Sequence, residues 1–277
     1  MSPCLIKRLT HNDLEDVDYT ADSLEDAAEK EPADGVYTVT NTFDGLRVLK
    51  FDEHLSRLED SATRAGIPLR LDRIRLRRAL RQMIQDSGFG RVRFRLTVPR
   101  SNPHELIISM EPFRALSAEF IARGARCITA PNSARSNPRA KTTGWMHDRK
   151  ALQAAMPPGI YDTILLDADG NLLEGLASNF YTVMDERLYT AEEGILHGIS
   201  RQIVFAVAPD ILPIVKEPVN INDLARMSEA FITSSSRGVV PVIEIDGYRL
   251  GDGLPGVKTM AIRHAYLQWV ATYLQDL

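Results

Sequence analysis

The stretch Leu165–Val183, LLDADGNLLEGLASNFYTV, decides how the fold of this chain is interpreted. An apolar segment precedes Asp169 and Gly170, a pair that favours a tight turn, and a second apolar segment follows them. This pattern predicts a β-hairpin. Glu174 is the exception in it, because a carboxylate at the end of a buried strand is unfavourable unless a cation or a protonated heterocycle lies beside it.

On both sides of this hairpin, helical and strand patterns alternate without an internal repeat. Before it, they predict a hairpin over 35–51, helices over 52–67 and 71–88, strands over 91–100, 105–113 and 126–131, and a helix near 145–156. After it, they predict strands over 229–236 and 239–246, and helices over 201–208 and 256–274. Residues 11–34, rich in Asp and Glu, are expected to form a mobile or surface-lying lead-in.

The order of these elements predicts two α/β or α+β domains. We place a small N-terminal domain at residues 1–114, an interdomain linker at 115–120 and a larger C-terminal domain at 121–277. A content of 44% hydrophobic and 25% charged residues is typical of a globular protein with a substantial core. The net charge of -4 argues against nucleic acid as the main partner.

The positions of the cysteines and the lengths of the apolar runs indicate the compartment of the protein and which partners it lacks. The two cysteines, Cys4 and Cys127, lie far apart, which predicts neither a disulfide framework nor a metal-ligand cluster. The first residues lack the apolar core of a signal peptide, and no apolar run approaches the roughly 18 residues of a membrane span. We therefore expect a cytoplasmic protein without a membrane partner and without a metal.

Two stretches rich in small residues could bind an anion. HGIS, residues 197–200, precedes a predicted helix, so backbone amides at Ile199 and Ser200 would point at a ligand; the alternative is an ordinary N-cap made by Ser200. TSSS, residues 233–236, offers hydroxyls at a strand end, and a plain polar turn is its alternative. A serine nucleophile is disfavoured there because the G-x-S-x-G elbow is absent.

Two lysines compete for a chemical role. Lys141 follows a loop rich in Pro, Asn and Ser, whereas Lys150 belongs to a charged stretch of helix and is expected to be solvated. A lysine buried beside a carbonyl cofactor loses its proton easily and forms a Schiff base. Lysine, carboxylate and anion site together are what pyridoxal phosphate requires, with Glu174 facing the pyridinium nitrogen.

The same residues resemble a known family, the class IV aminotransferases, which are fold-type IV pyridoxal-phosphate enzymes. The matching stretches are HLSRLEDSA (54–62), AKTTGW (140–145), LLDADGNLLEGLASNFYTV (165–183) and LHGISRQIV (196–204), and the similarity covers about 35–270. The family includes branched-chain and D-amino-acid aminotransferases, (R)-amine transaminases and aminodeoxychorismate lyase. The resemblance implies a two-domain fold with a smaller N-terminal α/β domain and a larger C-terminal pseudo-barrel, and a homodimer.

The resemblance also implies roles for single residues. Lys141, 33 positions before Glu174 as in the lyase branch and one short of the branched-chain branch, would form the Schiff base and shuttle the proton between substrate Cα and cofactor C4′. Glu174 would keep the pyridine nitrogen protonated, and Asn179 would shape the adjacent turn. The phosphate would be bound by a group of residues on three segments: Arg57, Ile199, Ser200, Ser235 and Ser236.

Departures from the family pattern concern the substrate pocket. The usual GDGVFE appears here as ADGVYT, with Tyr37 in the aromatic position and Thr38 in place of the acid, and Trp145 follows the lysine where the family often has other residues. Arg93 and Arg95 share one face of a predicted strand, so they could clamp a substrate carboxylate; a solvated strand face is the alternative.

Three functions remain open on the sequence. The leading one is a transaminase moving an amino group from an amino acid or amine to a 2-keto acid through Lys141. The alternative is aminodeoxychorismate lyase, which releases pyruvate and 4-aminobenzoate; AKTT and the spacing to Glu174 favour it, whereas the C-terminal GDGLPGVKTMAIRHAY favours the transaminases. A non-catalytic binding protein on the same scaffold is disfavoured, because Lys141, Glu174 and Arg57 are all present.

Overall fold

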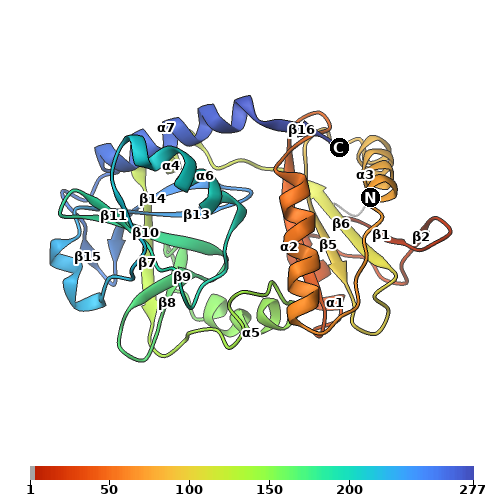
Figure 1. Cartoon of the computed structure of the whole chain (residues 1–277), viewed down its shortest axis with the longest axis horizontal. Helices are drawn as coiled ribbons and strands as arrows, with labels where there is room; N and C mark the ends of the chain where they lie inside the picture. The colour runs from red at the N-terminus through yellow and green to blue at the C-terminus, as the bar shows by residue number, and fades with distance from the viewer. Residues whose placement is uncertain (1–3) are drawn as a thin grey trace. The chain divides into compact units, whose positions relative to one another are not determined.

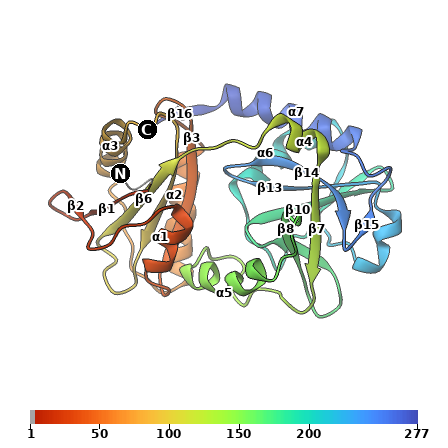
Figure 2. The same ribbon diagram turned by 180° about the vertical axis from the view of Figure 1, so that it is seen from behind.

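The computed structural model describes residues 4–277 and divides them into two compact units (Figures 1 and 2). The first unit comprises the chain up to Arg114, Ala140–Asp148 and Tyr273–Leu277. The second comprises Ala115–Arg139 and Arg149–Thr272. Segments far apart in sequence therefore belong to one unit, including 140–148 and 273–277, which the sequence-based division placed in the C-terminal domain. The boundaries at 114 and 120 stay a prediction.

The first unit is built on an antiparallel sheet with the strand order β16-β4-β3-β5-β6-β1-β2. Its strands are β1 (Leu5–Leu9), β2 (Leu14–Asp16), β3 (Val36–Asp44), β4 (Arg47–Leu49), β5 (Val92–Val98), β6 (Leu106–Pro112) and β16 (Leu274–Asp276). Strand β5 shows the predicted alternation, because Val92, Phe94, Leu96 and Val98 all enter one core cluster. The predicted hairpin over 35–51 is confirmed as β3 and β4.

Helices cover both faces of this sheet. Helices α2 (Phe51–Arg64) and α3 (Arg73–Ser87) share their core cluster with β5 and β6, and α1 (Leu24–Lys30) packs on the opposite face with Ile6 and Ile107 (Figure 2). Of the two expectations for residues 11–34, a mobile or a surface-lying lead-in, the structure agrees with the second, because α1 packs on the outside of the sheet. Among the acidic residues of this segment lies helix α1, whose Leu24 and Ala27 are buried. Its apolar face spans too few residues to give a recognisable helical pattern in the sequence.

The C-terminal residues are part of the first unit's core and cap one of its helices. Helix α2 begins after Lys50, which makes no capping bond with its own side chain. Gln275 replaces that cap, because its side-chain oxygen accepts a hydrogen bond of 2.9 Å from the Phe51 N–H. Leu277 is fully buried in the same cluster as α2. The start of α2 is therefore fixed by residues more than two hundred positions away.

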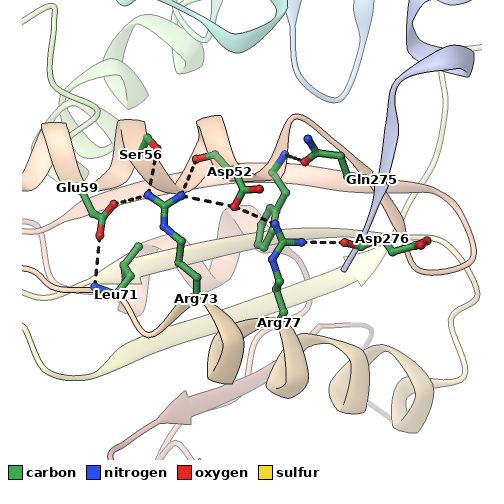
Figure 3. Close-up of polar contacts among 9 residues, drawn as sticks. Asp52, Ser56, Glu59, Leu71, Arg73, Arg77, Gln275 and Asp276 are labelled. Carbon is green, nitrogen blue, oxygen red and sulfur yellow. Dashed lines mark hydrogen bonds and ion pairs between the residues drawn. The ribbon is translucent and has the colours of Figure 1, made fainter.

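Two arginines of α3 strengthen the attachment of α2, as Figure 3 shows. Arg73 donates to Glu59 at 2.6 Å, and Arg77 donates to Asp52 at 2.9 Å. Arg77 also donates to the Asp276 carbonyl at 2.8 Å, so one side chain joins α3, α2 and the C-terminal strand. Each contact is partly exposed and modest alone, but together they fix the position of α2 in its unit.

The second unit contains a closed sheet. Strand β9 pairs with both β8 and β10, so the order β10-β13-β14-β7-β8-β9 returns to β10, which confirms the pseudo-barrel expected from the resemblance. The ring strands are β7 (Ala125–Ala130), β8 (Asp162–Leu166), β9 (Leu172–Gly175), β10 (Ser178–Met184), β13 (Glu229–Ser234) and β14 (Gly238–Ile245). Strands β11 (Arg187–Tyr189), β12 (Ile214–Val215) and β15 (Tyr248–Arg249) extend it.

Alternate side chains of the ring fill its interior and cover its outside. Phe180 and Ile232 join the interior cluster, whereas Tyr181 stacks on Phe231, with ring centroids 4.5 Å apart. Helices α6 (Ile199–Val207) and α7 (Val257–Thr272) pack on β13, and α7 also packs on β14. The remaining helices are α4 (Ala118–Arg123), the 3₁₀ turns η1 (Ala208–Asp210) and η2 (Ile221–Arg226), and α5 (Thr143–Ala154), which the two units divide. Within residues 4–277 no helix is long and apolar enough to cross a bilayer.

The opening stretch forms two consecutive hairpins. Asp167 closes the first turn by accepting from the Asp169 and Asn171 N–H groups, and Gly170 takes φ +81 there. A second, tighter turn at residues 176–177 then reverses β9 into β10. The predicted hairpin is confirmed, and the additional reversal places Glu174 beside that turn, paired with Asn179 on the facing strand.

Candidate active site

Lys141 is anchored by its backbone within the first unit. Its N–H donates to the Ser61 Oγ of α2 at 3.1 Å, and its carbonyl accepts from the Tyr37 N–H of β3 at 3.0 Å. Two residues on, Thr143 receives a hydrogen bond from the Gly35 N–H at 2.7 Å and begins α5. Lys141 is therefore held between β3 and α2, although it lies in a loop by sequence.

The Lys141 side chain is half-buried and its ammonium lies over an aromatic ring. Its Nζ is 4.6 Å from the centroid of Tyr37, which is itself buried. An ammonium over the face of a tyrosine is attracted by the negative charge of the ring face. Trp145 lies one turn further on, in the first turn of α5, and its N–H donates to Thr142 at 3.3 Å.

Arg57 is held on α2 by a short chain of polar side chains. Its Nη2 donates to the Thr38 hydroxyl at 3.2 Å, and that hydroxyl lies 2.9 Å from the Nδ1 of His54. Because Arg57 can only donate, the Thr38 oxygen accepts from it, and the Thr38 hydroxyl links Arg57 to the His54 ring. Burial, together with the charges of Arg57 and Lys141, lowers the pKa of His54 well below its usual value.

The charge of Arg57 has no acidic partner in the part of the chain that the structure describes. Its hydrogen bond goes to Thr38, and its buried Nε has none. Burial lowers the pKa of Arg57 to about 10, so the guanidinium is still a cation near neutral pH. A half-buried cation whose Nε is fully covered and has no acidic partner is unfavourable, which makes this place suited to an anionic ligand.

In the second unit, Glu174 is buried and accepts hydrogen bonds from Arg135 and from the backbone of Leu196. Its Oε1 accepts from the Arg135 Nη1 at 3.1 Å, and its Oε2 accepts from the Leu196 N–H at 3.0 Å. Both side chains of the ion pair are 5% exposed. Sequence reasoning missed Arg135, because an arginine in a polar loop is typical of a solvated surface. The Glu174 carboxyl group is thus held in position by contacts to both of its oxygens.

The turn next to Glu174 is fixed by two further polar side chains. Asn179, paired with Glu174 on the facing strand, donates to the Leu196 carbonyl at 2.7 Å, and its role in shaping the turn stays a prediction. Asp162 accepts from the Leu176 N–H at 3.1 Å and from the Ser178 hydroxyl at 2.8 Å. Asp162 was not predicted either, because its partners lie on other strands.

Helix α6 begins at Ile199 without a side-chain cap. Its N-cap is Gly198, so the alternative that Ser200 makes an ordinary N-cap is wrong; Ser200 lies inside the first turn. A Cβ at Gly198 would come within 2.2 Å of the Asn179 Oδ1, so only glycine fits there. The first N–H groups of a helix have no partner within it, which leaves the amides of Ile199 and Ser200 for a ligand.

Ser235 and Ser236 lie in the turn that joins β13 to β14. Both are half-buried, and the turn is closed by Arg237, whose N–H donates to the Ser234 carbonyl at 3.3 Å and whose Nε donates to the Ser234 hydroxyl at 2.9 Å. This places the two predicted serines at the tip of a hairpin whose strand β13 packs against α6. The second unit therefore brings together the serine turn and the helix α6.

Arg93 and Arg95 share a strand face as predicted, but the structure gives Arg95 another partner. Its guanidinium donates to Glu31 at 3.0 and 2.5 Å, and both side chains are buried. A substrate clamp formed by Arg95 is therefore corrected to an internal ion pair, which Glu31 of the acidic N-terminal segment completes. Arg93 is 44% exposed and contacts Glu111 at 3.4 Å, so its role toward a substrate stays a prediction.

Comparisons with known proteins show to which family the chain belongs. The sequence model of the family described as Amino-transferase class IV matches residues 35–245. The D-alanine aminotransferase of Bacillus licheniformis is 28% identical over 246 residues, which cover 84% of this chain and 86% of that protein. The branched-chain-amino-acid aminotransferase of Pseudomonas aeruginosa is 24% identical over 258 residues, or 86% of this chain and 84% of its own.

Solved structures show the same fold. The branched-chain aminotransferase of the thermophilic archaeon Thermoproteus uzoniensis, solved with norvaline, aligns with a TM-score of 0.80 at 23% identity and covers 98% of both chains. The Escherichia coli branched-chain amino acid aminotransferase gives a TM-score of 0.79 at 19% identity, again over 98% of both. The fold-type IV architecture expected from the sequence is confirmed.

Proposed function

The chain belongs to the class IV aminotransferases, and on this premise we propose that it moves an amino group between an α-amino acid and a 2-keto acid. The family uses pyridoxal 5′-phosphate, and one solved branched-chain relative holds the aminated form, pyridoxamine 5′-phosphate. When bound, this cofactor serves as an electron sink for the charge that develops at the substrate Cα. The observation that carries the proposal is the half-buried Lys141, anchored between β3 and α2 in the same unit as the unpartnered Nε of Arg57.

The chemistry of the residues fits this cofactor. Arg57 presents a cation that lacks an anion, and the uncapped start of α6 presents backbone amides, so both suit a phosphate. Glu174 is a buried carboxylate, which suits a protonated pyridine nitrogen. We propose the following cofactor-binding residues: Arg57, Lys141, Glu174, Ile199, Ser200, Ser235 and Ser236.

Lys141 is proposed as the residue that moves the proton. Its Nζ lies over the Tyr37 ring, and its charge acts on the buried His54. The neutral amine form of a lysine can accept a proton from the substrate Cα. The backbone N–H and carbonyl of Lys141 are both hydrogen-bonded, so the Cα from which its side chain extends has a fixed position. From this position the same amine could return the proton at C4′.

Glu174 and Arg135 are proposed to act together on the ring nitrogen. The hydrogen bonds from Arg135 and from the Leu196 N–H hold the carboxylate in one orientation. An oriented carboxylate stabilises a proton on a facing nitrogen without first having to reorganise. Tyr37, Trp145 and Arg93 are proposed to shape or contact the substrate.

The test uses the purified protein loaded with pyridoxal phosphate. We expect a visible absorbance band that borohydride removes, and a mass increment on the peptide that carries Lys141. Lys141→Ala should abolish the increment and the activity. Lys150→Ala is the matched control on α5 and should retain both. A loaded protein that carries the increment on Lys150 would refute the assignment.

A donor panel decides the substrate. L-amino acids, D-amino acids and (R)-amines are added singly, and a true donor converts the visible band to that of the aminated cofactor. We expect an amino acid to do so, since the relatives named above act on amino acids. Release of pyruvate from aminodeoxychorismate without this conversion would instead establish the lyase. A cytoplasmic location and a homodimer stay predictions.

A further inference from the structure

Tyr266 on α7 supports the start of α6. It is 2% exposed, and its hydroxyl donates a hydrogen bond of 2.9 Å to the Ser200 Oγ. Burial raises the pKa of Tyr266 to about 12, so the phenol keeps its proton and acts as a donor at neutral pH. The hydroxyl of Ser200 then has its own proton left to donate. Tyr266, which is itself outside the proposed anion site, therefore orients the hydroxyl proton of Ser200.

The ring of Tyr266 also lies beside Gly238, the residue of β14 that follows the serine turn. A Cβ on Gly238 would lie 3.3 Å from a ring carbon of Tyr266, and Gly238 takes φ +62 directly after the turn that holds Ser235 and Ser236. A side chain at this glycine would therefore meet the ring and strain the backbone. One turn earlier on α7, Arg263 donates to the Val239 carbonyl. Helix α7 thus holds the first two residues of β14.

Both parts of the proposed phosphate site in the second unit therefore meet at one side chain. The Ser200 hydroxyl depends on the phenol, and the end of the serine turn rests on the ring. We propose that Tyr266 is a positioning residue for the cofactor phosphate, which orients Ser200 and fixes its distance from the serine turn. This inference rests on the proposed function, because it takes Ser200 and the serine turn as phosphate ligands.

The test compares ligands with and without a phosphate. Apo-protein is titrated with pyridoxal phosphate and with pyridoxal, and the dissociation constants are taken from the visible band. For Tyr266→Phe we expect the constant for pyridoxal phosphate to rise by between about 2- and 10-fold, which corresponds to one neutral hydrogen bond. The constant for pyridoxal should not change. Tyr248→Phe is the matched control, since Tyr248 lies on β15 and is 44% exposed.

The variant Ser200→Ala distinguishes a failure of the inference on Tyr266 from a failure of the proposed phosphate site. We expect Ser200→Ala to weaken pyridoxal phosphate binding, and the double variant with Tyr266→Phe to be no weaker than Ser200→Ala alone, since the two side chains act through one hydrogen bond. If Ser200→Ala has no effect, the proposed phosphate site is wrong.

If Ser200→Ala weakens binding but Tyr266→Phe does not, only the inference on Tyr266 is wrong. An equal loss for pyridoxal and its phosphate in Tyr266→Phe would also overturn it, because a general loosening of the fold acts on both ligands alike.

Discussion

Arg95 and Arg57 are two arginines of the same unit, and their surroundings differ in one respect. Arg95 is 4% exposed and forms an ion pair with the buried carboxylate of Glu31. This carboxylate also accepts hydrogen bonds from the hydroxyls of Thr97 and Ser109. Arg57 has a hydroxyl partner and a buried Nε without one. A buried charge that the chain neutralises itself supports the fold, whereas one that it leaves unneutralised is suited to a ligand.

The largest expected effect comes from removing the partner of Arg95. Glu31→Ala leaves the buried Arg95 guanidinium without a carboxylate and two hydroxyls without their acceptor, and we expect the apo-protein to lose about 3–5 kcal/mol of unfolding free energy. Urea denaturation measures this loss. Glu25→Ala, on the helix α1 that Glu31 caps, is the control and should lie near the wild type. A Glu31→Ala variant as stable as the control would remove the distinction between the two arginines.

Arg57→Ala should have the opposite signature. The dissociation constant for pyridoxal phosphate is expected to rise by about 100-fold, since charge-assisted hydrogen bonds contribute about 1.5–3 kcal/mol each. The urea midpoint of the apo-protein should fall little, because this cation has no anionic partner to lose among the described residues. Arg64→Ala on the same helix controls for the loss of an arginine. A large drop in apo stability with unchanged affinity would make Arg57 structural.

Arg135 is the intermediate case, because its partner Glu174 is proposed to face the cofactor. Arg135→Met removes the guanidinium that donates to the buried Glu174, and we expect the apo-protein to lose about 1–3 kcal/mol of unfolding free energy. Bound cofactor should restore part of the lost stability, because its protonated ring nitrogen would replace the Arg135 cation beside Glu174. Thermal unfolding with and without pyridoxal phosphate measures the gain. A smaller gain than in the wild type would contradict the proposed pairing.

The smallest effect is the pH dependence of His54. Its folded pKa lies well below the unfolded value near 6.5, so the unfolded chain binds the proton first as the solution is acidified. The contribution is fully present above that value, and stability then falls by up to about 1.4 kcal/mol per pH unit until the folded pKa is reached. His54→Asn should flatten this slope in urea unfolding between about pH 7 and 5. His264→Asn, at a residue on α7, should not.

Much of the fold and part of the site could be predicted because the signals are local. Alternation on β5, the turn at Gly170 and the Lys141–Glu174 spacing all lie within short windows of sequence. The misses are residues whose partners are remote. Arg135 is typical of a surface loop until Glu174 is placed beside it. Tyr266 is typical of a core helix until its hydroxyl meets Ser200.

The sequence by itself determined the family pattern, the order of the elements and the residue types that can bind a phosphate, a carbonyl carbon and a ring nitrogen. Only the tertiary structure decided which charges are already neutralised within the chain. Glu31 lies 64 positions from Arg95, and Gln275 caps a helix that begins at Phe51. A local sequence pattern indicates which residues are buried and how the backbone turns. Whether a buried charge is neutralised depends instead on a side chain that is distant in the sequence and that folding brings within hydrogen-bond distance.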